Sequence, residues 1–386
     1  MEPYPDCPMD APALEFLKSL SESFGPSGFE RDPVLLMKKY VAPFADEISG
    51  DKLGSLHFSA RGKVGGPVVL LPGHVDEVGF IISGVNSHGF LTFNTIGGWF
   101  DQVLLGQRVK IRGSRGLVPG VIAAKPPHIL PPEERAKVVT RDKMFIDIGC
   151  SNEREAKDMG VRIGDPVVPD SPFYTIEKNV YRKPEGGGEE KAAGTTRLAC
   201  GKAFDDRAGA FVAAQVVRRL KEERIGHPNT VVGAATVQEE VGLRGARTSA
   251  HVVQPDVCIT LEVDIAGDVP GIEPHEAPTK MGFGPAILTY DASMIPNQGL
   301  KALLIRTAEE EKIPFQLSQM KGGGTDGGAI HIANAGCPTI VLTIPTRHIH
   351  SHVGMLSLDD VDNAVNLIVE VVKRLDEKTV DSFTAI

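Results

Sequence analysis

Residues 230–240 read TVVGAATVQEE, a mostly apolar run that ends in two adjacent glutamates. The run is short and rich in Val, as expected for a strand in a sheet that is covered on both faces. Two carboxylates directly after a buried strand repel each other and are costly to desolvate, so a positive partner is needed there. The stretch therefore predicts a buried strand with a charged site at its carboxyl end.

Three other apolar runs share this character, and helical patterns lie between the runs. These three runs comprise residues 67–71, 256–263 and 338–344. Residues 208–219 and 361–375 carry apolar side chains at three- and four-residue spacing, which predicts two amphipathic helices. Ser357, with Asp360 three residues later, resembles a capping box before the second helix. The alternation of strands and helices predicts an α/β fold, a mixed sheet with helices on both faces.

Residues 78–198 have a different pattern, in which short β-like runs alternate with turns. This pattern predicts a small β-rich domain inserted into a catalytic α/β domain, which is formed by residues 1–77 and 199–386. Near its end, residues 182–197 (RKPEGGGEEKAAGTTR) are rich in Gly, Glu and Lys. Such a composition is typical of a surface loop or linker that need not be ordered.

Composition restricts the class of protein. The chain has 386 residues, of which 41% are hydrophobic and 24% charged, as in soluble globular proteins. The formal net charge of −9 gives no reason to expect nucleic acid or an anionic membrane as a partner. No apolar run is long enough to span a membrane, and the acidic, proline-rich start does not resemble a secretory signal. The five cysteines are widely spaced and form no C-x-x-C pair, so we expect a cytoplasmic protein without a disulfide framework or a cysteine zinc site.

One pair of candidate residues follows the apolar run 67–71, and a second pair opens the predicted helix 208–219. His74 follows the run, and Asp76 stands two residues later, where a carboxylate could orient a metal-binding imidazole. His-x-Asp alone is weak support, since a single histidine is more often structural. Asp205 and Asp206 open the predicted helix, where acidic side chains either favour the helix dipole or bridge metal ions.

Two other runs carry further candidates. Glu262 and Asp264 are two residues apart, so an extended chain points both side chains to one face. His348, His350 and His352 alternate after the run that ends at residue 344. A histidine-rich turn can be a solvated loop, but this one follows a buried strand as the other candidates do.

The recurrence of this arrangement carries the functional prediction. Four separate apolar runs lead into acidic or histidine residues, namely His74, the pair Glu239 and Glu240, Glu262 or Asp264, and His350. Ligands of open α/β sheets bind at the carboxyl ends of the strands, where these residues would converge. Two imidazoles and three or more carboxylates favour zinc, cobalt or manganese over calcium. A carboxylate beyond those needed as ligands can act as the general base in metal-assisted hydrolysis.

Six ordered motifs resemble those of the TET-type dinuclear metalloaminopeptidases, a family that includes glutamyl and deblocking aminopeptidases and some members labelled endoglucanases. The motifs are GHVDEVGF, KAFDDR, QEEVGLRGAR, LEVDIAGDVPG, GGGTDGGAIH and RHIHS, and IGGWFDQVLLGQRV joins them in the middle segment. The resemblance covers nearly the whole chain. It implies a zinc-exopeptidase-like fold with an inserted small β-barrel for dimerisation, and peptide substrates cut at the N-terminus. It also implies two divalent metal ions per subunit, Zn²⁺ or Co²⁺ with Mn²⁺ as a further option, and homo-oligomers, often dodecamers built from dimers.

The resemblance also implies a role for each candidate side chain. His74 binds one metal ion, and Asp205 bridges both. Glu240 and His350 bind the second ion. Glu239 is the general base.

The fifth metal ligand is expected 22 residues after the metal-binding glutamate of QEE, where many relatives have Asp. In this chain that residue is Glu262, and Asp264 stays an alternative because the longer side chain can shift the local geometry. Asp76 would orient His74. The stretch 322–328, with its Thr and Asp, either shapes the substrate side or is a plain turn before a helix.

Other functions fit these residues less well than an aminopeptidase does. A glycosidase using Glu239 and Glu240 is disfavoured because adjacent residues at a strand end point in opposite directions. A non-catalytic scaffold would be expected to have lost a ligand or the base, and none is lost. A carboxypeptidase or a deacylase is the nearest rival. The preferred N-terminal residue is not predicted.

Overall fold

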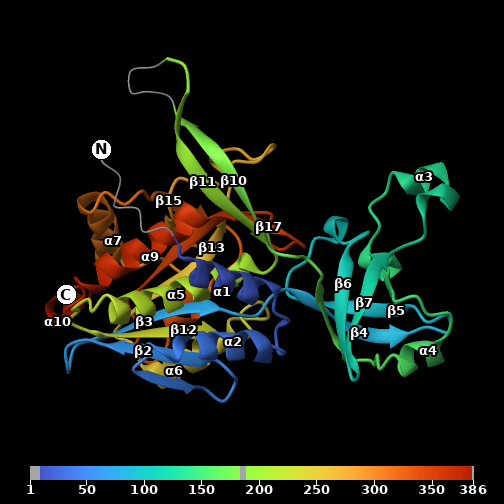
Figure 1. Cartoon of the computed structure of the whole chain (residues 1–386), viewed down its shortest axis with the longest axis horizontal. Coiled ribbons are helices and arrows are strands. Elements are labelled where there is room, and N and C mark those ends of the chain that lie inside the picture. Colours follow the sequence, from blue (N-terminus) through green and yellow to red (C-terminus); the bar gives the residue numbers. More distant parts are fainter. Residues whose placement is uncertain (1–8, 183–187, 385–386) are drawn as a thin grey trace.

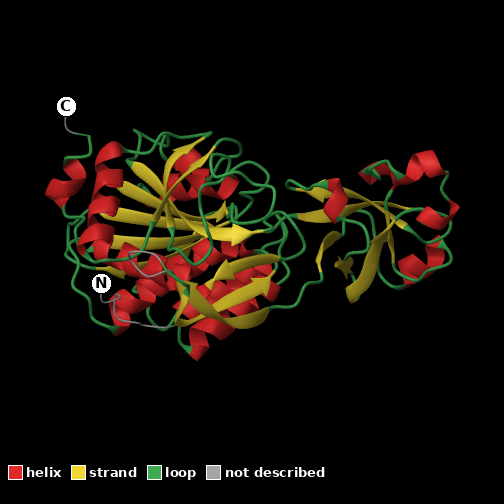
Figure 2. Ribbon diagram, turned by 90° about the horizontal axis from the view of Figure 1, so that it is seen from above, coloured by secondary structure: helices red, strands yellow, loops and turns green. Residues whose placement is uncertain are grey.

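The computed structural model describes residues 9–182 and 188–384. It has two lobes, an α/β lobe and a smaller β lobe that extends to one side (Figure 1). Figure 2 shows the main sheet from above, with helices on both of its sides. The predicted fold class, a mixed sheet covered by helices together with a small barrel, is confirmed.

The α/β lobe is built on an 11-stranded sheet within the described residues. Its main path, in spatial order, is β1 (Glu47–Gly50), β2 (Leu56–Arg61), β12 (Thr230–Thr236), β3 (Val68–His74), β13 (Val257–Ile265), β16 (Thr339–Arg347), β17 (Gly354–Ser357), β11 (Lys191–Gly201) and β10 (Tyr174–Arg182). Two further strands lie off this path, β14 (Ala286–Asp291) against β16 and β15 (Gln316–Met320) against β14. The four neighbours β12, β3, β13 and β16 are parallel, whereas the flanking pairs are antiparallel. The predicted apolar runs correspond to these four central strands.

Alternation of side chains explains why the central strands are apolar throughout. In β3, Val69 and Leu71 are buried in the larger core cluster, and Leu70 between them is buried in a second cluster. Because successive side chains point to opposite faces, a strand covered on both faces needs apolar residues at every position.

Different helices cover the two faces. The larger cluster contains side chains of α1 (Ala11–Glu22), α2 (Arg31–Val41), α5 (Phe204–Glu222), α7 (Gln298–Glu310), α9 (Leu358–Val372) and α10 (Glu377–Asp381). The second cluster contains side chains of α6 (Arg244–Val253) and α8 (Asp326–Ile330). The sheet is thus the middle layer of three.

The small lobe is a closed barrel. Its strands, in order around the barrel, are β4 (Gly79–Val85), β5 (Leu91–Ile96), β8 (Phe145–Asp147), β7 (Gly116–Ala123), β6 (Arg108–Gly113) and β9 (Pro166–Pro169). Two short helices, α3 (Pro132–Arg135) and α4 (Glu153–Asp158), lie between strands. Closure leaves no free strand edge, and the barrel has its own apolar core around Phe80, Ile111 and Ile146.

The end of the predicted insertion differs from the structure. The barrel strands end at residue 169, and β10 and β11 belong to the main sheet, where β11 pairs with β17. The predicted insertion 78–198 therefore included most of a hairpin of the α/β lobe, which projects from the body in Figure 1. The interpretation of 182–197 as a loop was wrong for residues 191–197, because they pair with β10. Residues 183–187 lie outside the described part of the chain.

The predicted helices are present with shifted ends. Helix α9 begins at Leu358, three residues before the predicted start, and α5 has non-helical backbone at Asp205 and Asp206. The predicted capping box is wrong, since the Ser357 side chain makes no capping hydrogen bond. The Asp360 carboxylate instead accepts hydrogen bonds from the backbone N–H groups of Gly282 and Gly284.

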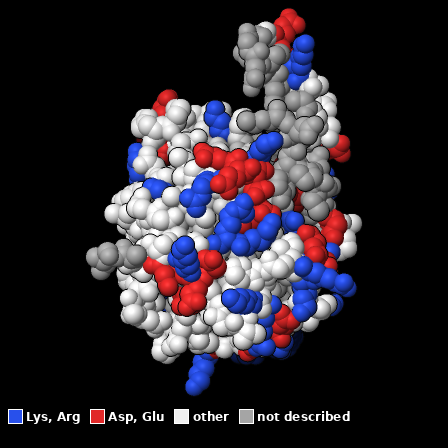
Figure 3. All heavy atoms as spheres, turned by 90° about the vertical axis from the view of Figure 1, so that its left-hand side faces the viewer, with Lys and Arg blue, Asp and Glu red and all other residues white. Residues whose placement is uncertain are grey.

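None of the helices in residues 9–182 and 188–384 is long and apolar enough to cross a membrane. The face opposite the barrel, seen in Figure 3, carries acidic and basic side chains in small mixed groups. This face therefore has no continuous basic surface of the kind that binds nucleic acid.

Candidate metal centre

The central strands bring the predicted residues to one edge of the sheet. His74 is the last residue of β3, and Glu239 and Glu240 follow β12 directly beside it. Glu262 lies in β13, and His350 follows β16. Because these four strands are parallel neighbours, side chains at and after their carboxyl ends come together.

Asp205 lies between the two histidines. Its Oδ1 is 3.1 Å from Nε2 of His74, and its Oδ2 is 3.3 Å from Nε2 of His350. The two oxygens of one carboxylate thus face different imidazoles. This is the arrangement required of a carboxylate that bridges two ions, the role that the resemblance implied for Asp205.

Two groups of side chains can each hold a metal ion. One consists of His74, Asp205 and Glu240, and the other of His74, Asp206 and Glu262. Nε2 of His350 is 3.6 Å from Oε2 of Glu240 and extends the first group. The donors are imidazole nitrogens and carboxylate oxygens, a set that suits zinc, cobalt or manganese.

Asp206 is a member of this site for which the resemblance implied no role, although the pair Asp205 and Asp206 was a candidate for a helix cap or a bridging ligand. It is buried, and its carboxylate accepts hydrogen bonds from the backbone N–H groups of His74, at 3.0 Å, and Gly209, at 2.9 Å. Burial, with the charge of Asp205 added, raises the pKa of Asp206 well above its ordinary value. The adjacent pair of aspartates was the available signal, but only the three-dimensional structure shows that Asp206 is buried beside His74 and Glu262.

His350 is oriented by the barrel lobe. Its Nδ1 donates to the backbone carbonyl of Gly98 at 2.8 Å, which leaves Nε2 facing Asp205 and Glu240. Gly98 lies in the loop after β5. A backbone carbonyl has no sequence signature, so residue patterns could not reveal this contact.

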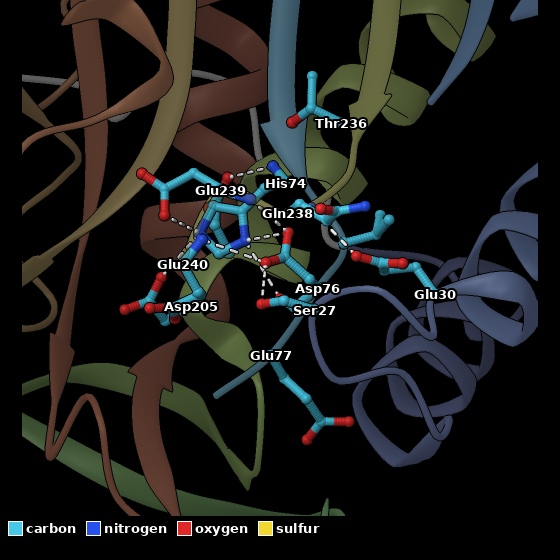
Figure 4. Close-up of polar contacts among 12 residues, drawn as sticks. Ser27, Glu30, His74, Asp76, Glu77, Asp205, Thr236, Gln238, Glu239 and Glu240 are labelled. Atoms are coloured by element: carbon cyan, nitrogen blue, oxygen red, sulfur yellow. Dashed lines mark hydrogen bonds and ion pairs between the residues drawn. The ribbon is translucent and has the colours of Figure 1, made fainter. Parts of the chain in front are cut away.

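Asp76 holds the turn that carries the two glutamates. Its carboxylate accepts hydrogen bonds from the backbone N–H groups of Glu239, at 3.0 Å, and Glu240, at 3.1 Å, and from the hydroxyl of Ser27, at 2.7 Å (Figure 4). Nδ1 of His74 is 3.1 Å from the backbone carbonyl of Asp76 and 3.5 Å from its carboxylate. Asp76 thus contacts His74 mainly through its backbone carbonyl, and its carboxylate fixes the adjacent strand end.

A buried ionic cluster of Glu77, Lys202 and Arg207 lies next to the segments that carry the site. Nζ of Lys202 is 2.6 and 2.7 Å from the two carboxylate oxygens of Glu77, and Nη2 of Arg207 is 3.1 Å from one of them. Arg207 also donates to the backbone carbonyl of Val75 at 2.9 Å. Desolvation lowers the pKa of Lys202 to about 8 despite the charge of Glu77. The cluster ties the end of β3 to the start of α5, the segments that carry His74 and Asp205.

Charge at the site favours a divalent cation. Five carboxylates converge on two imidazoles, and Oε1 of Glu240 is buried with no hydrogen-bond partner. Burial, with the charge of Asp205 added, raises the pKa of Glu240 to about 8, and burial raises the pKa of Glu239 and Glu262 as well. Buried carboxylates in this number require compensating positive charge, and the unpartnered oxygen provides a free ligand atom. The residues present therefore fit bound metal.

The site opens into a cleft of about 540 Å³. Its lining includes Gly322, Gly323, Gly324 and Thr325, so part of the glycine-rich stretch faces the space beside the candidate metal ligands. Asp326 does not line the cleft. It is buried, and its carboxylate accepts a hydrogen bond from the hydroxyl of Thr236 at 2.5 Å.

Three other candidates have different surroundings. Asp264 accepts a hydrogen bond from the hydroxyl of Ser318 and belongs to neither metal-binding group, whereas Glu262 belongs to one. The ring of His352 is buried and packs against Trp99, with ring centroids 5.4 Å apart. His348 also belongs to neither group. Of the three histidines in this turn, His350 alone faces Asp205 among the described residues.

An α/β domain with imidazoles and carboxylates gathered at the ends of its parallel strands is typical of metal-dependent hydrolases. The M42 glutamyl aminopeptidase family matches residues 54–183 and 189–367, and the chain belongs to this family. It is therefore a peptide hydrolase of the exopeptidase type, in a family of metallopeptidases. The resemblance to TET-type aminopeptidases is confirmed.

Relatives of known sequence or structure span nearly the whole chain. FrvX of Escherichia coli K12, provisionally named an aminopeptidase, is 38% identical to this chain. The match covers 96% of this chain and 98% of FrvX. The TET aminopeptidase of the marine sediment archaeon Thaumarchaeota archaeon SCGC AB-539-E09 is 58% identical with a TM-score of 0.89, over 97% of this chain and 99% of that one. The TET1 peptidase of Pyrococcus horikoshii, which can assemble into a tetrahedron or a large octahedral shell, is 28% identical with a TM-score of 0.77, over 94% and 100%.

Proposed function

We propose that this protein is an aminopeptidase with two divalent metal ions per subunit, and that Glu239 is its general base. The observation that carries the proposal is the position of Asp205, whose two carboxylate oxygens face different histidines at 3.1 and 3.3 Å. A carboxylate in this position can bind two ions at once, one beside each histidine.

The ligands divide between the two positions. His74 and Glu262 would hold one ion, Glu240 and His350 the other, and Asp205 would contact both. Asp206 lies close enough to His74 and Glu262 to contribute an oxygen or to hold the backbone of His74. Zn²⁺ and Co²⁺ suit these donors best, and Mn²⁺ is also compatible.

Metal ions bound there would polarise the scissile carbonyl and make a water molecule acidic near neutral pH. Glu239 would take the proton from the attacking water and deliver it to the leaving amine. Its carboxylate lines the cleft, and its side chain is only partly engaged, with Oε2 3.7 Å from Nε2 of His74. Asp76 keeps Glu239 in place through the backbone N–H of that residue.

The assembled form and the location complete the proposal. We propose a homo-oligomer, a dodecamer built from dimers, that acts on peptides in the cytoplasm. Cys200 and Cys258 are free and buried, which suits a reducing compartment.

The test combines metal analysis with a comparison of substrates that have a free or an acetylated N-terminus. The purified protein is stripped with chelator and reloaded with Zn²⁺, Co²⁺ or Mn²⁺, and hydrolysis of aminoacyl p-nitroanilides is followed beside metal content. Activity should disappear with the metal and return when two ions per chain are bound. N-acetylated substrates should stay intact, because the enzyme requires a free N-terminus. Full activity at a metal content near zero would defeat the proposal.

A further inference from the structure

Beyond the metal-site residues, the wall of the cleft is apolar except for Thr325, whose hydroxyl donates to the Asp291 carboxylate at 2.9 Å. The apolar residues that line it are Leu243, Val263, Ile265, Met320 and Ile349. They come from the turn after the two glutamates, from β13, from the end of β15 and from the turn that bears His350. Gly322, Gly323 and Gly324 complete this wall and add no side chain to fill the space.

No Lys or Arg lines the cleft within the part of the chain that the structure describes. The cations that are neighbours of lining residues in the sequence are engaged elsewhere. Lys321 donates to the carbonyl of His275 at 3.0 Å, and Arg244 donates to the side chain of Gln238 at 3.0 Å. Arg347 forms a double contact with the Asp268 carboxylate, at 2.9 and 2.6 Å.

The acidic side chains in the lining are all part of the proposed metal site. All four carboxylates of the lining, those of Asp205, Glu239, Glu240 and Glu262, belong to the proposed metal site. No other Asp or Glu lines the cleft among the described residues. A basic substrate side chain therefore has no free carboxylate to pair with.

We propose that this cleft receives the N-terminal side chain of the substrate and selects large, uncharged apolar residues such as leucine and methionine. The inference rests on the proposed aminopeptidase function. An acidic side chain, as the family description would suggest, would lose its hydration without gaining a cation and would lie beside the carboxylates of the site. An apolar side chain would instead bury its surface against Ile265 and Met320.

The first measurement ranks substrates. The enzyme, loaded with Zn²⁺ or Co²⁺, is assayed with leucyl, methionyl, alanyl, glutamyl and lysyl p-nitroanilides, and kcat/KM is compared. The kcat/KM of leucyl and methionyl substrates should exceed that of the alanyl substrate by about tenfold or more. One methylene group in an apolar pocket changes kcat/KM by roughly 10- to 200-fold. Leucyl and methionyl substrates should exceed glutamyl and lysyl by about 100-fold, because an unpaired charge is rejected more strongly than a missing methylene.

The second measurement tests the wall itself. Ile265 is 44% exposed at the end of β13, so Ile265→Arg adds a cation to the cleft without changing the core. This variant should raise the glutamyl-to-leucyl ratio of kcat/KM by about tenfold or more. Ile332→Arg is the matched control, because Ile332 is 71% exposed and does not line the cleft. The control should leave the ratio unchanged.

Binding provides a readout that does not depend on turnover. Calorimetry with non-hydrolysable leucyl and glutamyl ketomethylene dipeptides should show the same order of affinity as kcat/KM, and the same reversal in Ile265→Arg. Hydrolysis in which glutamyl or lysyl substrates equal or exceed leucyl overturns the selectivity but leaves the aminopeptidase function standing. If the enzyme cleaves none of the aminoacyl substrates while two ions are bound per chain, the proposed function is overturned, and this inference with it.

Discussion

Glu239 and Glu240 are neighbours in the chain, but their carboxylates face different partners. Oε2 of Glu239 is 3.7 Å from Nε2 of His74, and Oε2 of Glu240 is 3.6 Å from Nε2 of His350. Both glutamates line the cleft, and Oε1 of Glu240 is buried without a hydrogen-bond partner, which leaves that oxygen free for a metal ion. These surroundings suit a metal ligand in Glu240 and a base in Glu239.

Glu239→Gln should therefore keep both ions and lose most of kcat. An amide cannot accept the proton of the attacking water, and general-base catalysis contributes roughly 10²- to 10⁴-fold. Glu240→Gln should lose metal instead. Elemental analysis beside kcat separates the two effects, and a reversal of the two phenotypes would show that the roles are exchanged.

The choice between Glu262 and Asp264 can be made by metal counting. Glu262→Ala should reduce the metal bound per chain, because Glu262 faces His74 with Oε2 3.9 Å from Nε2. Asp264→Ala should keep the full complement, since the Asp264 carboxylate is engaged by Ser318. Circular dichroism controls for folding of both variants. Normal stoichiometry in a folded Glu262→Ala protein would assign the ligand role to Asp264.

At the scale of elements, the loop after β5 joins the barrel to the metal site. The carbonyl of Gly98 accepts from Nδ1 of His350, and a Cβ at Gly98 would lie 3.0 Å from that same nitrogen. At Gly97 the φ angle is +75°, and a Cβ there would lie 3.3 Å from Glu240. The glycines of this loop therefore allow its backbone to approach two proposed ligands.

Gly98→Ala should weaken metal binding at the position held by Glu240 and His350. The added methyl would displace the His350 ring, and loss of such a supporting contact typically costs about 10- to 100-fold in affinity. Gly226→Ala is a suitable control, because its Cβ would meet no atom within 4 Å. Titration of the apo-proteins with Zn²⁺ or Co²⁺ measures the effect. Equal affinities for the two variants would show that the loop does not position His350.

The same elements show how far the sequence could lead. The four central strands are covered on both faces, so their apolar runs stand out, and their ends carry the candidate residues. The β10–β11 hairpin was missed because Lys191–Gly201 contains Thr, Gly and Lys with little alternation. Within the site, the contact of Gly98 with His350 depends on a backbone atom, and the role of Asp206 depends on a kink in the first turn of α5. Neither of these features leaves a pattern in residue type.

At the scale of the whole molecule, the barrel carries several large apolar side chains that are exposed to solvent. Exposed large apolar side chains between β6 and β9 or close to them are Leu105, Leu117, Val121, Ile129, Val138, Met159 and Ile163. All five proposed ligands lie in the α/β lobe, and the loop after β5 reaches the site through the contact of the Gly98 carbonyl with His350. Exposed apolar surface of this kind is typical of protein–protein contacts. The barrel is therefore the part of the chain on which we expect subunits to meet.

The corresponding prediction is a large homo-oligomer that depends on the barrel. Light scattering of the metal-loaded protein should give about 500 kDa, twelve times the 41.3 kDa of one chain. Ile163→Glu places a charge at a barrel residue that is 70% exposed, and it should shift the mass toward smaller species because a charge buried in an interface is costly. Val64→Glu, at a residue of the α/β lobe that is 97% exposed, should leave the mass unchanged. A wild-type mass near that of one chain would exclude the oligomer, and equal behaviour of the two variants would move the contact away from this part of the barrel.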